Sequence, residues 1–223
     1  MNISDITAVF VNCCTFEYTK ALVDGLRNCY PDLKFVIVDN GSFDESTEYL
    51  NRIDGMEGLR VIFNETNRGH GPGMDQAIRG AKTSLLLVLD SDVEVLQCGF
   101  LELMVPYFEA DPQLYLLGDK SKKGRCGRAR QRYEQALRDG TLNVNLFHSM
   151  MRRDWYLTLP RFPHHGSIST MNQNEGRERG LAFGEFPIQK YLHHIGGRTI
   201  TVLGGRFVSG EPIDPRTFRG EEY

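Results

Sequence analysis

Four short apolar runs in the first half of the chain restrict the folds that it can adopt. The runs are rich in aliphatic and β-branched residues without polar alternation, and they cover residues 7–11, 35–38, 60–63 and 85–89. Strands that are buried on both faces have this composition, as in a parallel sheet. The runs alternate with helical patterns. The sequence therefore predicts an α/β fold, an open sheet of mainly parallel strands with right-handed crossovers and helices on both faces.

Each predicted strand is followed by a segment with the periodicity or the end signals of a helix. Apolar residues recur every three to four positions over residues 17–29, which is typical of an amphipathic helix. Apolar positions within 49–53 predict a second helix, and Pro72 favours the start of a third. A fourth helix is predicted from Phe100, and we expect it to break or bend at Pro106.

The second half of the chain is less regular. Residues 160–185 are rich in Pro, His, Gly, Ser and Asn and are predicted to form loops, while residues 199–203 are a last strand candidate. The length of the chain predicts one domain over residues 1–223. We divide this domain into a regular half, residues 1–118, and an irregular half, residues 119–223.

Composition excludes several classes of protein. Hydrophobic residues make up 40% and charged residues 25% of the chain, and its net charge is -3, which excludes global disorder and a general attraction to nucleic acid. No apolar run approaches the ~20 residues of a membrane-spanning helix, and the first residues lack a signal-peptide pattern. The five cysteines form no CxxC pair, so we expect reduced thiols in a cytoplasmic protein.

A basic run over residues 120–138 leaves two alternatives open. Its lysines and arginines could contact phosphates of a ligand or of a membrane surface, which would make the protein peripheral at a membrane. Such runs are also typical of a solvated helix face. Tyr133 is its single aromatic residue, which disfavours binding of single-stranded nucleic acid.

Polar side chains follow all four predicted strands. Ligands of open α/β sheets bind beyond the carboxyl ends of the strands, so these side chains would face one crevice. In chain order they are Asn12 and Cys13, then Asp39, then Asn67 and Gly69, and finally Asp90, Ser91 and Asp92.

The Asp90-Ser91-Asp92 motif is the sharpest chemical signal. Two carboxylates two residues apart point in roughly the same direction after an extended strand. Hard oxygen ligands of this kind suit Mg²⁺ or Mn²⁺, ions that proteins commonly hold together with substrate phosphates. The alternative is an ordinary surface turn. Asp39 also has two possible roles. Its carboxylate could accept a hydrogen bond from a nucleotide base or a ribose, or it could stabilise a local Asx-turn.

The glycines at Gly69, Gly71 and Gly73 resemble a nucleotide-binding loop. They follow a predicted strand and open a predicted helix, which is the context that such a loop requires. We interpret them as allowing the start of the helix to approach a phosphate or a sugar closely. A flexible turn is the alternative.

The four strand ends together resemble those of family 2 glycosyltransferases of the GT-A fold. The matching segments stand in the same order and spacing, and the resemblance covers about residues 5–118. It implies a metal-dependent enzyme that moves one sugar from a nucleotide-diphosphate sugar, a UDP-sugar in our interpretation, to a hydroxyl group. The acceptor would be a glycan, a lipid-linked molecule or a small molecule, and residues 119–223 would bind it.

The resemblance also implies a role for each matched residue. Asp39 would recognise the base, and Asp92 would bind the Mn²⁺ or Mg²⁺ ion that bridges the diphosphate. The segment around His194 resembles a His-x-Gly-Gly motif, so this histidine would complete the metal shell. The remaining contacts to the nucleotide sugar would come from Asn12, Cys13, Asn67, Gly69, Asp90 and Ser91, with Asp90 also near the metal.

The second half departs from the family pattern at the general base. Inverting members commonly carry a Glu-Asp pair, and this chain has no such dipeptide. Glu185, Asp154 and Glu175 are the candidates, and we favour Glu185. The missing pair keeps a non-catalytic sugar-nucleotide binder open as an alternative. Further alternatives are a nucleotidyltransferase, which would need a basic glycine-rich loop after the first strand, and a methyltransferase that uses Gly69–Gly73 for S-adenosylmethionine.

Overall fold

The computed structural model describes residues 2–120, 142–164 and 169–195. The strand predicted at 199–203 and all of the basic run beyond Lys120 lie outside the described residues. Within the described part, no helix is both long enough and apolar enough to cross a lipid bilayer.

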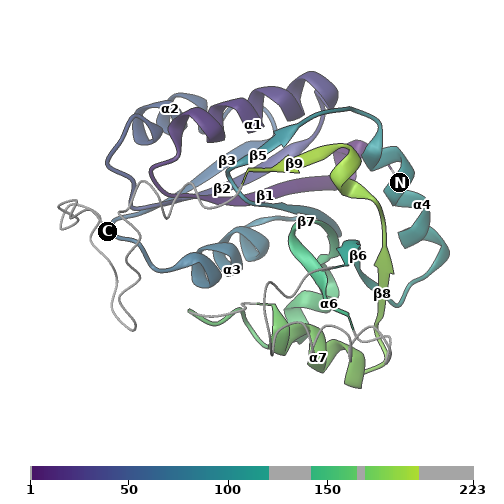
Figure 1. Cartoon of the computed structure of the whole chain (residues 1–223). Helices are drawn as coiled ribbons and strands as arrows, with labels where there is room; N and C mark the ends of the chain where they lie inside the picture. Colours follow the sequence, from purple (N-terminus) through teal and green to yellow (C-terminus); the bar gives the residue numbers. More distant parts are fainter. Residues whose placement is uncertain (1, 121–141, 165–168, 196–223) are drawn as a thin grey trace.

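A seven-stranded sheet forms the centre of the fold, in the order β3-β2-β1-β4-β7-β6-β8 (Figure 1). Strand β7 runs antiparallel to both of its neighbours, and the other pairings are parallel. The strands are β1 (Ile6–Asn12), β2 (Lys34–Asn40), β3 (Leu59–Asn64), β4 (Leu85–Leu89), β6 (Leu114–Lys120), β7 (Val144–Arg152) and β8 (Ala182–Glu185). A small antiparallel sheet pairs β5 (Val93–Val95) with β9 (Leu192–His194).

Helices cover both faces of the large sheet, as the sequence predicts (Figure 1). Apolar side chains of α1, α2 and α4 join one core, and those of α3 and α6 join the other. The helices are α1 (Phe16–Cys29), α2 (Ser46–Ile53), α3 (His70–Gly80), α4 (Phe100–Ala110), α6 (Arg153–Thr158) and α7 (Thr170–Glu178), with short 3-10 turns at η1 (Ile3–Asp5) and η2 (Ile188–Lys190).

The alternation of side chains along β1 explains why both faces need cover. All seven residues of β1 are buried. Val9 and Val11 belong to the core under α3, while Ala8 and Phe10 belong to the core under α1 and α2. A strand with apolar residues on both faces is stable only between two layers of helices.

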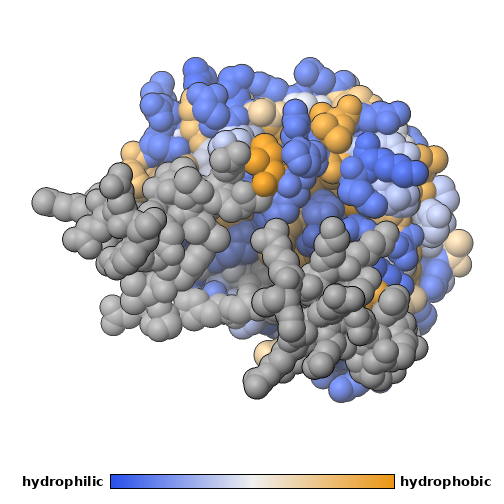
Figure 2. All heavy atoms as spheres, viewed as in Figure 1, coloured by the Kyte–Doolittle hydropathy of each residue, from blue (hydrophilic) through white to orange (hydrophobic). Residues whose placement is uncertain are grey.

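On the face shown in Figure 2, the described surface is largely hydrophilic.

The four predicted strands and the three helices between them are confirmed, whereas a break of the fourth helix at Pro106 and a loop throughout 160–185 are not found. Helix α4 continues through Pro106 to Ala110, although proline removes one backbone hydrogen bond there. The predicted loop at 160–185 contains α7 and β8. Both elements are short and are held by distant partners, since β8 pairs with β6 while α7 bonds to Tyr115 on β6 and to Val144 on β7. A sequence window carries no signal of such contacts.

The prediction of reduced cysteines is wrong for one pair. Cys29 at the end of α1 and Cys98 before α4 form a disulfide, with their Cα atoms 5.2 Å apart. The two residues are 69 positions apart in the chain, and only the packing of α1 beside the segment after β5 brings them together. Cys13 and Cys14 are free and buried. The disulfide removes the cysteine argument for a cytoplasmic location.

Candidate functional site

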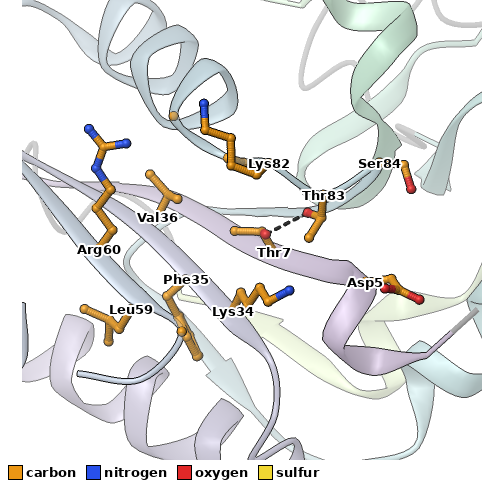
Figure 3. A pocket seen from close by; sticks show the side chains of 13 residues that line it. Asp5, Thr7, Lys34, Phe35, Val36, Leu59, Arg60, Lys82, Thr83 and Ser84 are labelled. Atoms are coloured by element: carbon orange, nitrogen blue, oxygen red, sulfur yellow. Dashed lines mark hydrogen bonds between the residues drawn. The ribbon is translucent and has the colours of Figure 1, made fainter. Parts of the chain in front are cut away.

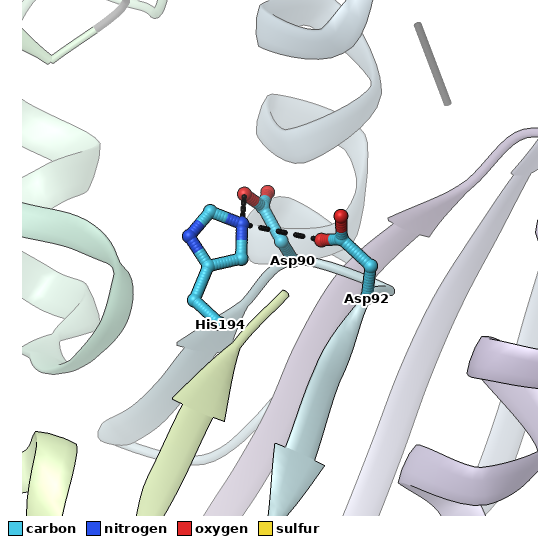
Figure 4. Close-up of side chains that lie close together, drawn as sticks. All are labelled: Asp90, Asp92 and His194. Atoms are coloured by element: carbon cyan, nitrogen blue, oxygen red, sulfur yellow. Dashed lines mark ion pairs between the residues drawn. The ribbon is translucent and has the colours of Figure 1, made fainter. Parts of the chain in front are cut away.

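Asp90, Asp92 and His194 meet at the carboxyl edge of the sheet (Figure 4). The Nε2 atom of His194 lies 3.0 Å from Oδ2 of Asp90 and 3.2 Å from Oδ1 of Asp92. The pairing of β5 with β9 creates this contact, because Val93 is in register with His194 and the amide of Ile195 donates to the carbonyl oxygen of Asp92. The pairing of these two short strands therefore places His194 beside the Asp90-Ser91-Asp92 motif, which lies about a hundred residues earlier in the chain.

This cluster has the chemistry of a divalent cation site. Its three ligand atoms lie within 4.8 Å of one another, and Oδ1 of Asp90 is buried and makes no hydrogen bond with the described residues. Hydrogen bonds to Asp90 and Asp92 raise the pKa of His194 to about 10. An imidazolium here offsets one of the two carboxylate charges, and a bound divalent cation would take its place. Two carboxylates and one imidazole fit Mn²⁺ well, whereas Mg²⁺ prefers an all-oxygen shell.

Two further histidines lie beside the cluster, and the sequence analysis assigned a role to neither. His70 begins α3, and its Nε2 atom lies 3.4 Å from Oδ1 of Asp90. His148 on β7 is in register with Leu89, and its ring lies 5.8 Å from that of His194. Burial lowers the pKa of His148, which favours the neutral imidazole. No sequence signal pointed to His148, because an antiparallel strand from the second half inserts it beside β4.

A buried hydrogen-bond network joins the ends of β1 and β2. The side-chain amide of Asn12 donates to Oδ1 of Asp39 at 2.8 Å and to the hydroxyl of Ser42 at 2.9 Å. Its oxygen accepts hydrogen bonds from Thr15 at 2.8 Å and Thr19 at 2.7 Å. The side chain of Asn12 is therefore fully used inside the protein, and any contact that Asn12 makes with a ligand would come from its backbone.

Asp39 is buried at this edge, and burial raises the pKa of its carboxyl group. The hydrogen bonds from Asn12 and Ser42 act in the opposite direction and favour the carboxylate. Ser91 extends the same network, since its buried hydroxyl shares a hydrogen bond of 2.9 Å with the hydroxyl of Thr15. The predicted nucleotide-binding residues Asn12, Asp39 and Ser91 are thus brought together by the structure.

The loop after β3 packs onto the loop after β1. The Oδ1 atom of Asn67 accepts hydrogen bonds from Asn40 and from the backbone amide of Gly69, each at 2.8 Å, while its amide donates to Sγ of Cys13 at 3.4 Å. A hydrogen bond to Cys14, together with burial, raises the pKa of the Cys13 thiol. Cys13 is therefore a protonated packing residue here rather than a reactive thiolate.

Two of the glycines in Gly69–Gly73 lie against another segment of the chain. A Cβ atom at position 71 would lie 2.0 Å from the carbonyl oxygen of Pro163, and one at position 69 would lie 2.9 Å from the ring of His164. The space that these two glycines open is filled by residues 162–164 of the chain itself. Close approach of a phosphate or a sugar to this helix start stays a prediction.

We expect Gly71→Ala to lower the free energy of unfolding by about 2 kcal/mol, because the added methyl group forces the backbone at Pro163 to move. Denaturation in urea measures this change. Gly25→Ala in α1 is the matched control, since its nearest neighbours are side-chain atoms of Val95 at 3.1 Å and alanine favours a helix. Equal stability of the two variants would contradict the packing role of Gly71.

Two of the three predicted base candidates, Glu185 and Asp154, lie at opposite edges of the sheet. Glu185 ends β8 at the carboxyl edge and is exposed. It is in register with Gly118 on β6, and three strand spacings of ~4.8 Å place it about 14 Å from β4. Asp154 lies in α6, whose first amide donates to the carbonyl of Ser84 before β4. The structure therefore does not bring Asp154 to Asp90, and its position argues against a catalytic role.

The third base candidate, Glu175, is held inside its own helix. Its Oε1 atom accepts a hydrogen bond from Arg179 at 2.7 Å in α7. Glu185 remains our predicted base.

Comparison with known protein families decides where the chain belongs. The model of glycosyl transferase family 2 matches residues 6–171, a range that includes the four strand ends and crosses our predicted division at residue 118. The chain belongs to glycosyl transferase family 2. A comparison with curated proteins found no match.

Solved structures of low sequence identity share the fold. A mannosyltransferase from Pyrobaculum calidifontis, in complex with GDP-Man and Mn²⁺, is 16% identical with a TM-score of 0.65, and the match covers 82% of this chain and 55% of that one. TarS from S. aureus with UDP-GlcNAc is 14% identical with a TM-score of 0.63, and the match covers 92% and 62%.

Glucosyl-3-phosphoglycerate synthase from Mycobacterium tuberculosis, with Mn²⁺, UDP and its product, is 15% identical with a TM-score of 0.62, and the match covers 81% and 68%. The chain spans little more than half the length of the first of these structures. The likeness establishes the GT-A fold of this family 2 member, an α/β architecture of mainly parallel strands.

Proposed function

We propose that this family 2 member is a metal-dependent glycosyltransferase that moves one sugar from a nucleotide-diphosphate sugar to a hydroxyl acceptor. The observation that carries this proposal is the convergence of Asp90, Asp92 and His194 at the carboxyl edge of the sheet. That edge is where an open α/β sheet binds its ligands. The buried Asp39 lies at the end of β2 on the same edge.

The roles of the residues follow from their chemistry. Asp92 and His194 would hold the metal ion together with Asp90, and Mn²⁺ fits these donors. The ion, when bound, supplies positive charge that stabilises a departing diphosphate. Asp39 would accept a hydrogen bond from the base or the ribose, supported by Asn12. Glu185 is our proposed general base, since it is an exposed carboxylate at the same edge.

We further propose a UDP-sugar as the donor. Among the structures compared above, TarS holds UDP-GlcNAc and the glucosyl-3-phosphoglycerate synthase holds UDP, while the mannosyltransferase holds GDP-Man. The proposed acceptor is a hydroxyl-bearing molecule, which could be a glycan, a lipid-linked molecule or a small molecule. A cytoplasmic location and a peripheral membrane contact through residues 120–138 stay predictions.

A thermal-shift panel tests the donor and the metal together. We expect a UDP-sugar with Mn²⁺ at a hundred times its Kd to stabilise the fold by about 2.7 kcal/mol, which raises Tm by roughly 5–10 °C. GDP-Man, Mg²⁺ in place of Mn²⁺, and each donor with EDTA are the comparison conditions. A Tm rise with S-adenosylmethionine and none with any nucleotide sugar would overturn the proposal in favour of a methyltransferase.

Turnover separates an enzyme from a binder. We expect the donor that raises Tm to release its nucleoside diphosphate when acceptors are added. Donor binding without release in a broad acceptor screen would support the non-catalytic alternative.

A further inference from the structure

A groove with a volume of about 790 Å³ opens at the amino edge of the large sheet (Figure 3). It lies between the starts of β1, β2 and β3 and the loop that joins α3 to β4. From Ser84 in that loop to Asp90, the chain runs along β4 for six residues, about 20 Å at 3.3 Å per residue. The groove is therefore separate from the edge where we propose that the nucleotide sugar binds.

Three cations from three different elements line this groove: Lys34 on β2, Arg60 on β3 and Lys82 after α3. Arg60 is in register with Val36, a residue of the core under α3. Since side chains alternate along a strand, Lys34 and Arg60 share that face of the sheet. Lys82 follows the helix that covers the same face, so the three charges border one space.

These cations lack the partners that most neighbouring cations have. Arg79, Arg152 and Arg153 bond to a carboxylate or to backbone carbonyls. Among the described residues, Lys34, Arg60 and Lys82 form no ion pair or side-chain hydrogen bond, and all three are exposed. One carboxylate lines the groove, that of Asp5, and it already accepts a hydrogen bond from the amide of Asn2 at 2.9 Å.

The end of helix α3 does not account for this arrangement. A cation near a helix C-terminus is favoured by the dipole of the helix, and Lys82 stands two residues after Gly80. Lys34 and Arg60 come from strands, so the dipole explains one charge of the three. The hydroxyls of Thr7 and Thr83, which line the groove, form hydrogen bonds within the protein. They share a hydrogen bond of 2.7 Å, and Thr83 donates to the carbonyl of Leu85.

We propose that this basic groove, defined by Lys34, Arg60 and Lys82, binds a phosphate-bearing ligand. An anion in the groove relieves the repulsion among three like charges in a chain whose net charge is -3. Arg offers paired donors to phosphate oxygens, and Lys offers a compact point charge. A volume of about 790 Å³ lies within the range of small-molecule sites. The phosphate would belong to a free metabolite or to a phospholipid headgroup.

Binding of two probes to the full chain tests this site and separates the two sources. The probes are inorganic tripolyphosphate, followed by calorimetry, and phosphatidylcholine vesicles with and without phosphatidylglycerol, followed by flotation. EDTA is present throughout, so that no metal ion at Asp90 and Asp92 contributes to binding. Tripolyphosphate binding points to a free ligand, and binding to anionic vesicles alone points to a headgroup.

The groove variant combines Lys34→Gln, Arg60→Gln and Lys82→Gln. A matched control combines Lys20→Gln, Arg52→Gln and Lys190→Gln, which change the net charge equally at exposed positions outside the groove. We expect the groove variant to lose at least tenfold in affinity for the probe that binds, and the control to stay within twofold.

Two results would overturn the proposal: neither probe binds the wild-type chain, or both triple variants lose affinity equally. Melting curves check that the variants are folded. If the groove variant does not fold, Lys34→Gln, Arg60→Gln and Lys82→Gln are measured singly, and each is expected to weaken binding about threefold; three unchanged affinities would also overturn the proposal.

Discussion

Replacing Asp92 by asparagine is expected to abolish Mn²⁺-dependent donor binding and to lower kcat/KM for sugar transfer by about a thousandfold. Such a loss corresponds to about 4 kcal/mol of transition-state stabilisation, a size that fits the removal of a metal ion from a leaving diphosphate. The substitution keeps the shape of a buried side chain and removes one of the two carboxylates beside His194. Calorimetry with Mn²⁺ and a coupled assay of nucleotide release measure the two effects.

Glu94→Gln is the control for this result. Glu94 lies on β5 two residues after Asp92, is exposed, and pairs with His193 at 3.5 Å outside the cluster. We expect its variant to bind Mn²⁺ and to transfer sugar as the wild type does. Full activity of Asp92→Asn, with a normal melting curve, would refute the metal site.

Removal of the Asn12 side chain is expected to destabilise the fold by about 3 kcal/mol. The Asn12→Ala variant removes one of the two side-chain donors to the buried carboxylate of Asp39, and leaves the hydroxyls of Thr15 and Thr19 without their shared acceptor. Each buried polar group that loses its partner costs about 1–3 kcal/mol. Urea denaturation followed by circular dichroism gives the free energy of unfolding.

An exposed asparagine provides the comparison for Asn12. Asn51 lies on the surface of α2, where its amide donates to the carbonyl of Thr47 at 2.8 Å. We expect Asn51→Ala to change the free energy of unfolding by less than about 0.5 kcal/mol, as is usual at the surface. A loss below about 1 kcal/mol for Asn12→Ala would show that the network is not structural.

Much of the regular half, residues 1–118, could be predicted because its signals are local. The apolar run at 85–89 predicts β4, and burial of all five residues confirms that strand. The polar residues that follow each strand share one edge because parallel strands end together. Asp39 and Asp90 could therefore be placed at one crevice before any contact was known.

The second half resisted prediction because its elements are held by partners far away in the chain. Strand β8 has four residues, and it pairs with β6 over a gap of more than sixty positions. The same distance in sequence hid the disulfide between Cys29 and Cys98. The contact of Pro163 with Gly71 likewise joins segments that lie far apart in the chain.

Residue periodicity and the order of segments were enough to predict the α/β class, the four strand ends and the Asp90-Ser91-Asp92 motif. The tertiary structure was needed to show which side chains from distant parts of the chain lie beside these residues. The pairing of β5 with β9 places His194 beside the carboxylates of Asp90 and Asp92. The position of β7 next to β4 places His148 near the same cluster. The three cations of the groove come from three elements that meet at the amino edge of the sheet. Strand pairing and core packing join residues that lie far apart in the chain. Such contacts leave no local pattern in the sequence from which they could be predicted.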